Sequence, residues 1–330
     1  FPLHARITHP LQTPVKPVVW FDEVGKADVD VAGGKGANLG ELVRAGLPVP
    51  PGFIVTSAAY RAFLDASGLE PEIRALLDAV DGQNPQQLNV ASVEIRQLLT
   101  AVPTEIAAAV LGAYVHMGGA PVAVRSSATA EDLAEASFAG QQSTFLNVTA
   151  DRLVDAVRDC WASLFEPQAI AYRHRRGIEH LEVNIAVVVQ KMVQSHRSGV
   201  AFTVHPVTGD RGSIVIEAVL GLGEAAVSGV VTPDLYVVNK ATLAIDERHI
   251  SHQDRQLVRS ETSGPGEETN AWIPVPLPQA TSQKLSDAEI AELGGIARRI
   301  EEHYGAPQDI EWAEEGGEFF IVQARPVTTV

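Results

Sequence analysis

Two short segments near the C-terminus combine residue types that suit a metal and a phosphate. Asp309 and Glu311 share one face of an expected strand, because side chains alternate with a period of two. Gln323 and Arg325 share a face of the next strand in the same way. If the connecting turn centres on Gly317, Glu311 lies opposite Gln323. Asp309 then lies opposite Arg325, and the four polar groups converge on one face.

The converging groups suit a hard cation and the anion that it binds. A carboxylate beside an amide oxygen favours Mg²⁺, so Glu311 and Gln323 are the candidate metal ligands, and Arg325 can meet the phosphates that the metal bridges. Three apolar side chains are expected on the opposite face: Ile310, Trp312 and Val322. The alternative is a solvated hairpin face with a cross-strand salt bridge, and these residues alone leave it open.

A second candidate segment spans residues 123–132 and 137–142. An expected strand ends in Arg125 and opens into a stretch of serine, threonine and glycine. A bidentate guanidinium with short hydroxyl donors suits a phosphate group. The alternative is that the hydroxyls cap the next helix and that Arg125 forms a structural ion pair.

A third candidate segment, residues 31–40, places Lys35 among glycines at the start of an expected helix. Glycines let the backbone approach a ligand, and a lysine beside a helix start suits an oxyanion. The spacing does not match the Walker A motif. A helix start with a solvated lysine is an equally good interpretation of this segment by itself.

A fourth segment resembles a dinucleotide-binding fingerprint only weakly. Gly221, Gly223 and Ala226 satisfy its glycine spacing after an expected strand. The fingerprint expects an acidic residue about 20 positions later, where residues 238–241 read Val-Asn-Lys-Ala. Because this half of the chain also lacks repeated helix–strand alternation, the pattern disfavours a Rossmann domain.

The elements that must position these segments divide into a helix-rich and a strand-rich half. In the first half we expect strands at 18–21, 53–56 and 122–125 and helical stretches at 34–45, 57–118 and 150–176. From residue 185 we expect strands at 185–193, 199–204, 213–220 and 235–245, a long loop at 259–283, a helix at 286–304 and the hairpin at 309–327. The sequence therefore predicts an α+β protein: a lead-in at 1–17, a first lobe at 18–184 and a second lobe at 185–330.

The composition limits the classes of partner. The chain has 330 residues, of which 45% are hydrophobic and 20% charged, and its formal net charge is −16. Such an acidic balance argues against nucleic acid as the main partner, although an acidic protein can still bind one nucleotide. No apolar run reaches the roughly 18 residues of a membrane span, so we expect no membrane association.

Two smaller features favour a cytoplasmic location, because neither is typical of a secreted protein. Cys160 is the single cysteine, and its helical spacing from Val157 and Trp161 indicates a core residue rather than a reactive thiol. Residues 1–17 lack the charged and apolar blocks of a signal peptide. We expect them to form a flexible lead-in, or to mark a trimmed fragment.

Taken together, the segments resemble the N-terminal nucleotide-binding domain of phosphoenolpyruvate synthases, pyruvate phosphate dikinases and rifampin phosphotransferases. The resemblance runs from about Val18 to Val327. It rests on these motifs: Gly33-Gly-Lys-Gly36, Val124-Arg-Ser-Ser-Ala-Thr-Ala-Glu-Asp132, Ser137-Phe-Ala-Gly-Gln141, Gly221-Leu-Gly-Glu224, Asp309-Ile-Glu-Trp312 and Val322-Gln-Ala-Arg-Pro326.

The resemblance implies a two-lobe ATP-grasp fold that holds ATP in the cleft between the lobes. It gives catalytic roles to Lys35 and Arg125 on the phosphates and to Arg325 on the transferring phosphoryl group, with Glu311 and Gln323 on Mg²⁺. The residues that it places around the nucleotide are Lys35, Arg125, Thr129, Gly140, Gln141, Gln190, Met192, Val193, Glu217, Asp309, Glu311, Gln323 and Arg325. Within this set, the strand around Gln190 would meet adenine through its backbone, and Asp309 and Glu217 would line the ribose or metal side. Relatives often have an aspartate where this sequence has His205, which we expect to be structural.

The resemblance also implies partners. In the family, ATP phosphorylates a histidine on a swivelling carrier domain, which passes the phosphoryl group to pyruvate or to the antibiotic. None of the ten histidines lies in the sequence context of that carrier, and we expect no acceptor-substrate domain within these 330 residues. We therefore expect an incomplete ATP-dependent phosphotransferase of the phosphoenolpyruvate synthase type that transfers the β-phosphoryl group, yields AMP and phosphate, and needs both domains. A rifampin phosphotransferase remains an alternative, as does a nucleotide-binding regulatory module without phosphoryl transfer.

Overall fold

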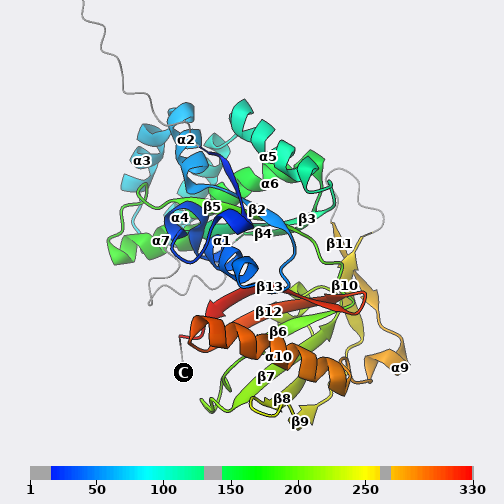
Figure 1. Cartoon of the computed structure of the whole chain (residues 1–330). Coiled ribbons are helices and arrows are strands. Elements are labelled where there is room, and N and C mark those ends of the chain that lie inside the picture. Colours follow the sequence, from blue (N-terminus) through cyan, green and yellow to red (C-terminus); the bar gives the residue numbers. More distant parts are fainter. Residues whose placement is uncertain (1–15, 130–142, 261–268, 329–330) are drawn as a thin grey trace, which may run out of the picture.

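The computed structural model describes residues 16–129, 143–260 and 269–328, which fold into two lobes (Figure 1). Within these ranges the first lobe contains a five-stranded antiparallel sheet in the order β1-β2-β5-β3-β4. Its strands are β1 (Val18–Trp20), β2 (Gly52–Val55), β3 (Val122–Ala128), β4 (Thr144–Val148) and β5 (Ile185–Lys191).

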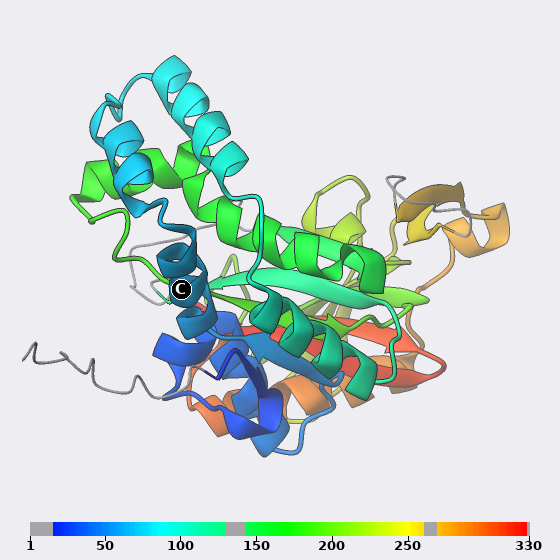
Figure 2. The ribbon, with the colours of Figure 1, turned by 90° about the horizontal axis from the view of Figure 1, so that it is seen from above.

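Helices cover both faces of this sheet, because its central strands are apolar on both sides. Phe53 and Val55 face a core shared with helices α2 to α7, whereas Ile54 between them packs on α1. Trp161 of α6 stacks on Phe63 of α2 at a centroid distance of 4.9 Å. The helices are α1 (Val29–Arg44), α2 (Ser57–Ser67), α3 (Glu70–Asp78), α4 (Pro85–Leu98), α5 (Thr104–His116), α6 (Ala150–Ala162) and α7 (Pro167–Arg176), with 3-10 turns η1 (Phe21–Glu23) and η2 (Ser163–Phe165). Seen from above, helix α4, drawn in cyan, extends away from the strands of the second lobe (Figure 2).

The second lobe is built on a six-stranded antiparallel sheet, counted over the described residues, in the order β13-β12-β6-β7-β8-β9. The strands are β6 (Arg197–Phe202), β7 (Ser213–Leu220), β8 (Asp234–Asn239), β9 (Ile245–His249), β12 (Gln308–Glu315) and β13 (Glu318–Pro326). Helix α10 (Asp287–Tyr304) covers one face of the sheet, where Ile310, Ile216 and Tyr236 pack against its apolar residues. Side chains at the alternate positions of the same strands therefore lie on the face opposite α10.

A small additional unit lies beside the second lobe, in a region that the sequence predicts to be a loop. Strand β10 (Arg255–Arg259) pairs with β11 (Asn270–Pro274), and α9 (Leu277–Ala280) follows. The prediction of a loop over 259–283 is therefore wrong for β11 and α9. The reason is composition: β11 is partly exposed and has no alternating apolar face, so the surrounding prolines, glycines and hydroxyls dominate the pattern. Helix α8 (Glu224–Val227) contacts β6 and β7 of the six-stranded sheet and also β10 of this small unit.

The chain passes between the two sheets after Lys191. Strand β5 pairs with β2 and β3 of the first sheet, although its residues were expected to open the strand-rich second half. All residues from Ile185 to Gln190 are buried, as in a central strand covered on both faces. Periodicity identifies such a strand but does not say which sheet it joins. The expected strand at 235–245 is likewise two strands, β8 and β9, separated by a turn.

Helix α1 lies between the lobes and contributes to both cores (Figure 1). Leu39 packs with β2 and β5 of the first sheet, whereas Leu42 packs with β12 and α10 of the second lobe. The helix is interrupted at Gly33, whose φ of 66° favours glycine. A Cβ at Gly33 would lie 2.2 Å from the carbonyl oxygen of Ser127, so this glycine permits close contact between α1 and β3.

Two further expectations from the sequence concern Cys160 and membrane spans. Cys160 is fully buried in the first-lobe core, and burial raises the pKa of its thiol, which confirms the expectation of a structural cysteine. Over the described ranges, none of the helices has both the length and the apolar character of a membrane span.

Candidate functional site

The β12–β13 hairpin brings the polar residues together in the expected register. Glu311 pairs with Gln323 and Asp309 pairs with Arg325, which confirms both cross-strand predictions. The row continues across the sheet, because Glu311 also pairs with Val200 of β6, which in turn pairs with Glu217 of β7. Glu217, Glu311 and Gln323 therefore share the face opposite α10, which we call the polar face.

A bulge in this hairpin sets the position of Val322. The strands close through Glu315 and Glu318, and the pairing shifts by one residue between Glu311 and Trp312. Val322 is the extra residue on β13, so it does not continue the apolar face that the sequence predicts for it. Ile310 and Trp312 are buried as expected, whereas Val322 is half-buried and its carbonyl is used by the first lobe.

Arg125 of β3 is the residue that makes this contact. Its Nη1 donates to the carbonyl oxygen of Val322 at 3.1 Å, and its Nη2 lies 3.5 Å from Oε2 of Glu311. The side chain is 13% exposed, and its buried Nε has no hydrogen-bond partner among the residues that the structure describes. A buried N–H without a partner is unusual, so this guanidinium retains capacity for a further acceptor.

Lys35 is held next to Arg125 by the contact between α1 and β3. Its Nζ donates to the carbonyl oxygen of Ser126 at 3.0 Å. The hydroxyl of Ser127 donates to the carbonyl of Ala32 and accepts from the backbone N–H of Gly36. Ser126 and Ser127 therefore join β3 to α1. The two candidate phosphate ligands, Lys35 and Arg125, come from these two joined elements.

The remaining expected residues of the β3 segment lie at or beyond its end. Thr129 donates its backbone N–H and its hydroxyl to the carbonyl of Asn184, at 3.2 and 3.1 Å. This contact anchors the start of β5 and gives the hydroxyl a structural role. Gly140 and Gln141 lie outside the described residues. Nucleotide contacts for all three remain predictions.

Asp309, Glu311 and Glu217 concentrate negative charge on the polar face. Burial and the charge of Glu311 raise the pKa of Asp309, while its ion pair with Arg325, at 2.8 and 2.9 Å, acts in the opposite direction. Burial and the charge of Asp309 raise the pKa of Glu217. Arg325 itself is 60% exposed and can reach a bound anion. The face thus carries carboxylates that a cation would stabilise.

The predicted metal site rests on a smaller set of residues. The amide Nε2 of Gln323 donates to Oε1 of Glu311 at 3.2 Å, which brings an amide and a carboxylate into contact. In the part of the chain that the structure describes, no three His, Cys, Asp or Glu side chains form a metal-binding group. One carboxylate and one amide suit Mg²⁺, which usually retains several waters and binds phosphate oxygens.

The segment expected to meet adenine comprises the end of β5 and the start of the connection between the two sheets. Gln190 is buried in β5, and its amide lies 3.5 Å from the carbonyl of Pro50. The backbone N–H of Met192 donates to the carbonyl of Pro121. The side chain of Met192 packs against a cluster that includes Val219. Val219 follows Glu217 by two residues, about 7 Å along the same face of β7. The connection therefore lies at one end of the polar face.

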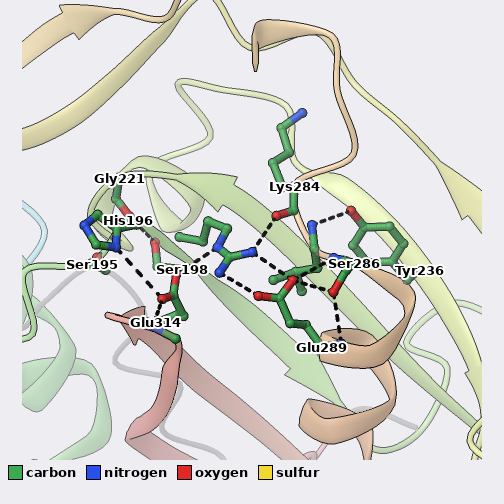
Figure 3. Close-up of polar contacts among 12 residues, drawn as sticks. Ser195, His196, Ser198, Gly221, Tyr236, Lys284, Ser286, Glu289 and Glu314 are labelled. Carbon is green, nitrogen blue, oxygen red and sulfur yellow. Dashed lines mark hydrogen bonds and ion pairs between the residues drawn. The ribbon is translucent and has the colours of Figure 1, made fainter. Parts of the chain in front are cut away.

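Sequence reasoning missed the residues that hold the hairpin in place. Glu314 is 2% exposed, and it accepts hydrogen bonds from Nε of Arg197 at 2.8 Å and from the backbone N–H of Gly317 at 2.6 Å. Figure 3 shows Glu314 and Glu289 of α10 directed toward a common guanidinium, and Arg197 lies 2.7 Å from Glu289. Ser286 and Glu289 form a capping box at the start of α10. This capping pattern was visible in the sequence, but its partner Arg197, 92 residues away, was not.

Two further motifs have structural roles. Gly221 has φ of 88°, and a Cβ there would lie 2.4 Å from the carbonyl of Leu257, so this glycine permits contact with β10. The surrounding sheet is antiparallel, in agreement with the rejection of a Rossmann domain. His205 accepts hydrogen bonds at Nδ1 from the backbone N–H groups of Val207 and Thr208, which matches its expected structural role.

Comparison with known proteins gives consistent matches over nearly the whole chain. Residues 29–330 match the family described as "Pyruvate phosphate dikinase, AMP/ATP-binding domain". A probable phosphoenolpyruvate synthase of Methanocaldococcus jannaschii is 48% identical over 96% of this chain and 27% of its own length. The corresponding protein of Methanothermobacter thermautotrophicus is 47% identical over 96% of this chain and 46% of its own length. The phosphoenolpyruvate synthase of Pyrococcus furiosus is 41% identical over 95% of this chain and 44% of its own length.

The chain thus spans less than half the length of these relatives. Among solved structures, the D-alanyl-alanine synthetase A of Vibrio cholerae covers 72% of this chain and 54% of its own, at 12% identity and a TM-score of 0.29. That similarity is too low to support an argument.

Proposed function

Because the chain belongs to the family of pyruvate phosphate dikinase AMP/ATP-binding domains, we propose that it binds Mg·ATP on the polar face of the second lobe, in an ATP-grasp arrangement. One observation carries the proposal: Arg125 of the first lobe reaches Glu311 and Val322 of the hairpin. A candidate phosphate ligand and a candidate metal ligand from different lobes thus lie at one point. The α+β architecture with two lobes supports this arrangement.

The residues present fit Mg²⁺. Glu311 and Gln323 supply a carboxylate and an amide in contact, and Asp309 and Glu217 add negative charge nearby. When bound, Mg²⁺ neutralises phosphate charge and so eases attack at phosphorus. The chain's own residues then orient the phosphates. Arg125 offers a buried N–H without a described partner, and Lys35 lies beside it.

We propose that Arg325 contacts the phosphoryl group that is transferred. It projects from the same strand face as Gln323, two residues further along, and its large exposed fraction leaves it accessible. A positioned cation stabilises the charge that develops during phosphoryl transfer. Asp309 orients this guanidinium through the ion pair that joins them.

The proposed reaction moves the β-phosphoryl group of ATP to a histidine of a carrier domain. The histidine nitrogen forms a P–N bond to the β-phosphorus while the bond between the α- and β-phosphates breaks and AMP leaves. Water cleaves the bond between the β- and γ-phosphates, and the γ-phosphoryl group is released as phosphate. The names of the relatives favour onward transfer to pyruvate over transfer to rifampin. In this proposal the carrier and acceptor domains correspond to the remaining length of those relatives. We also infer a cytoplasmic location, which the single buried cysteine favours.

A binding titration and a transfer assay test the proposal together. Mg·ATP, or a non-hydrolysable analogue, should release or absorb heat on binding and raise the melting temperature. ATP labelled at the β-phosphate should transfer its label to a supplied carrier domain of a phosphoenolpyruvate synthase. Binding without transfer would favour the regulatory module. No heat and no thermal shift at saturating nucleotide would reject the nucleotide site.

A further inference from the structure

Asn147 has an unusual backbone conformation within β4. Its φ is 55°, in the left-handed region, and its side chain is buried with 3% exposed. Within the described ranges, Leu243 is the other non-glycine residue with positive φ, and it lies in a turn far along the chain. Asparagine tolerates this region better than most residues do. The pairing of β3 with β4 shifts by one residue here, so Asn147 belongs to a bulge.

The side-chain amide of Asn147 is used at both ends. Its Nδ2 donates to Oδ1 of Asn270 in β11 at 2.6 Å, and its Oδ1 accepts from Nε2 of Gln194 at 2.7 Å. The backbone N–H of Gln194 donates in turn to Oε2 of Glu315, at the turn of the β12–β13 hairpin. A line of polar groups therefore joins the first sheet, the small sheet, the connection between the lobes and the hairpin.

This arrangement fixes the middle of the connection between the sheets, residues 192–196. The ends of the connection are held by backbone hydrogen bonds, from Met192 to Pro121 and from His196 to Glu314. Gln194 is held through its side chain by Asn147. Between them, the backbone N–H of Val193 has no hydrogen-bond partner in the part of the chain that the structure describes. A donor of this kind, held in place on both sides, suits recognition of the edge of a base.

We propose that Asn147 is a positioning residue for recognition of the nucleotide base. It does not touch the nucleotide; it holds Gln194 so that the N–H of Val193 points to the base. This inference rests on the proposed function, because it needs a nucleotide whose base lies against residues 192–194. Its effect should therefore fall on base affinity and base preference. The phosphate ligands Lys35 and Arg125 are held by separate contacts.

The variant Asn147→Gly tests this role with the least disturbance of the backbone, since glycine adopts positive φ freely. We expect the Kd for Mg·ATP to rise about tenfold, the equivalent of about 1.4 kcal/mol. The preference for ATP over GTP should fall by a similar factor. The Kd for magnesium tripolyphosphate, which has no base, should stay unchanged. Asn84→Gly is the matched control, because it removes an asparagine that caps α4 away from the site.

Gln194→Met is the second variant, and it decides the matter if Asn147→Gly fails to fold. It keeps the length of the side chain but removes the amide, and it should reproduce the loss of base preference. Wild-type base preference in both variants, or an equal loss of tripolyphosphate affinity, would overturn the positioning role. A wild-type protein that binds ATP and GTP equally would also overturn it. A wild-type protein that binds no nucleotide would instead reject the proposed function.

Discussion

Arg125 and Glu311 lie 3.5 Å apart across the boundary between the lobes, so a candidate phosphate ligand and a candidate metal ligand neutralise each other in this structure. Neither group is fully exposed, and the guanidinium also holds the Val322 carbonyl. On the proposed function, a bound phosphate would contact Arg125 and a bound metal would contact Glu311, and both contacts would replace this ion pair. On this proposal, Arg125 and Glu311 are in place before the ligand binds, and each offsets the charge of the other.

Arg325→Ala should separate chemistry from binding. Because Arg325 is exposed and projects from the end of the polar face, its loss should leave ATP affinity within about tenfold. Label transfer to a carrier domain should fall by on the order of 10³, as loss of a phosphoryl-stabilising arginine commonly does. Transfer at the wild-type rate would mean that Arg325 is only the ion-pair partner of Asp309.

Glu311→Ala should act on binding itself. It removes a proposed metal ligand and leaves Arg125 with the Val322 carbonyl as its described partner. We expect the Kd for ATP in the presence of Mg²⁺ to rise at least about tenfold. ATP affinity without Mg²⁺ should change far less. Glu318→Ala, at the exposed end of the same hairpin, is the control. Equal losses with and without Mg²⁺ would argue against a metal at Glu311.

Glu217→Gln should stabilise the ligand-free protein at neutral pH. Burial and the charge of Asp309 raise the pKa of Glu217, so the folded state holds its proton more tightly than the unfolded state does. The ionised carboxylate therefore costs stability: this cost is complete at pH values above the folded pKa, and it disappears as the pH falls below about 4.3. Melting temperatures at pH 7 and pH 4 measure the difference. A variant that is less stable at pH 7 would contradict the prediction.

Glu314→Ala should destabilise the second lobe. It leaves Arg197 paired with Glu289 alone and removes the acceptor of the Gly317 backbone N–H, and loss of charged hydrogen bonds of this kind costs about 2 kcal/mol. Burial opposes ionisation, but hydrogen bonds from Arg197 and Gly317 outweigh it and lower the pKa of Glu314. The stabilisation is thus present above about pH 4.3 and is lost as the pH falls through the lower folded pKa. Urea titrations over this range provide the test, and a difference that stays constant to pH 2 would count against it.

Local patterns in the sequence predicted the hairpin well. The alternation around Asp309 and Glu311 gave the shared face, and the paired glycines gave the turn. The bulge was not predictable, because a turn from Glu315 to Glu318 and a pairing of Glu311 with Gln323 differ by one residue. Each of these two registers fits the alternation of side chains. Both occur in the hairpin because Val322 is an extra residue between them.

Contacts between distant segments were beyond the sequence for a different reason. Nothing near β5 in the chain indicates that it pairs with β2 and β3. Arg197 and Glu289, and likewise Asn147 and Gln194, are ordinary polar residues until the fold brings them together. The candidate ligands were found from motifs, whereas the residues that hold them in place required the structure.

The shared helix α1 has a consequence for how the protein unfolds. Leu39 belongs to the core of the first lobe, while Leu42 and the following Leu47 belong to the core of the second. A lobe produced alone would either lose this helix or expose its other apolar side to water. Thermal denaturation should therefore proceed as one cooperative transition, and a second lobe expressed from residue 192 onward should aggregate. We therefore expect the two lobes to unfold as a single unit although each has its own sheet.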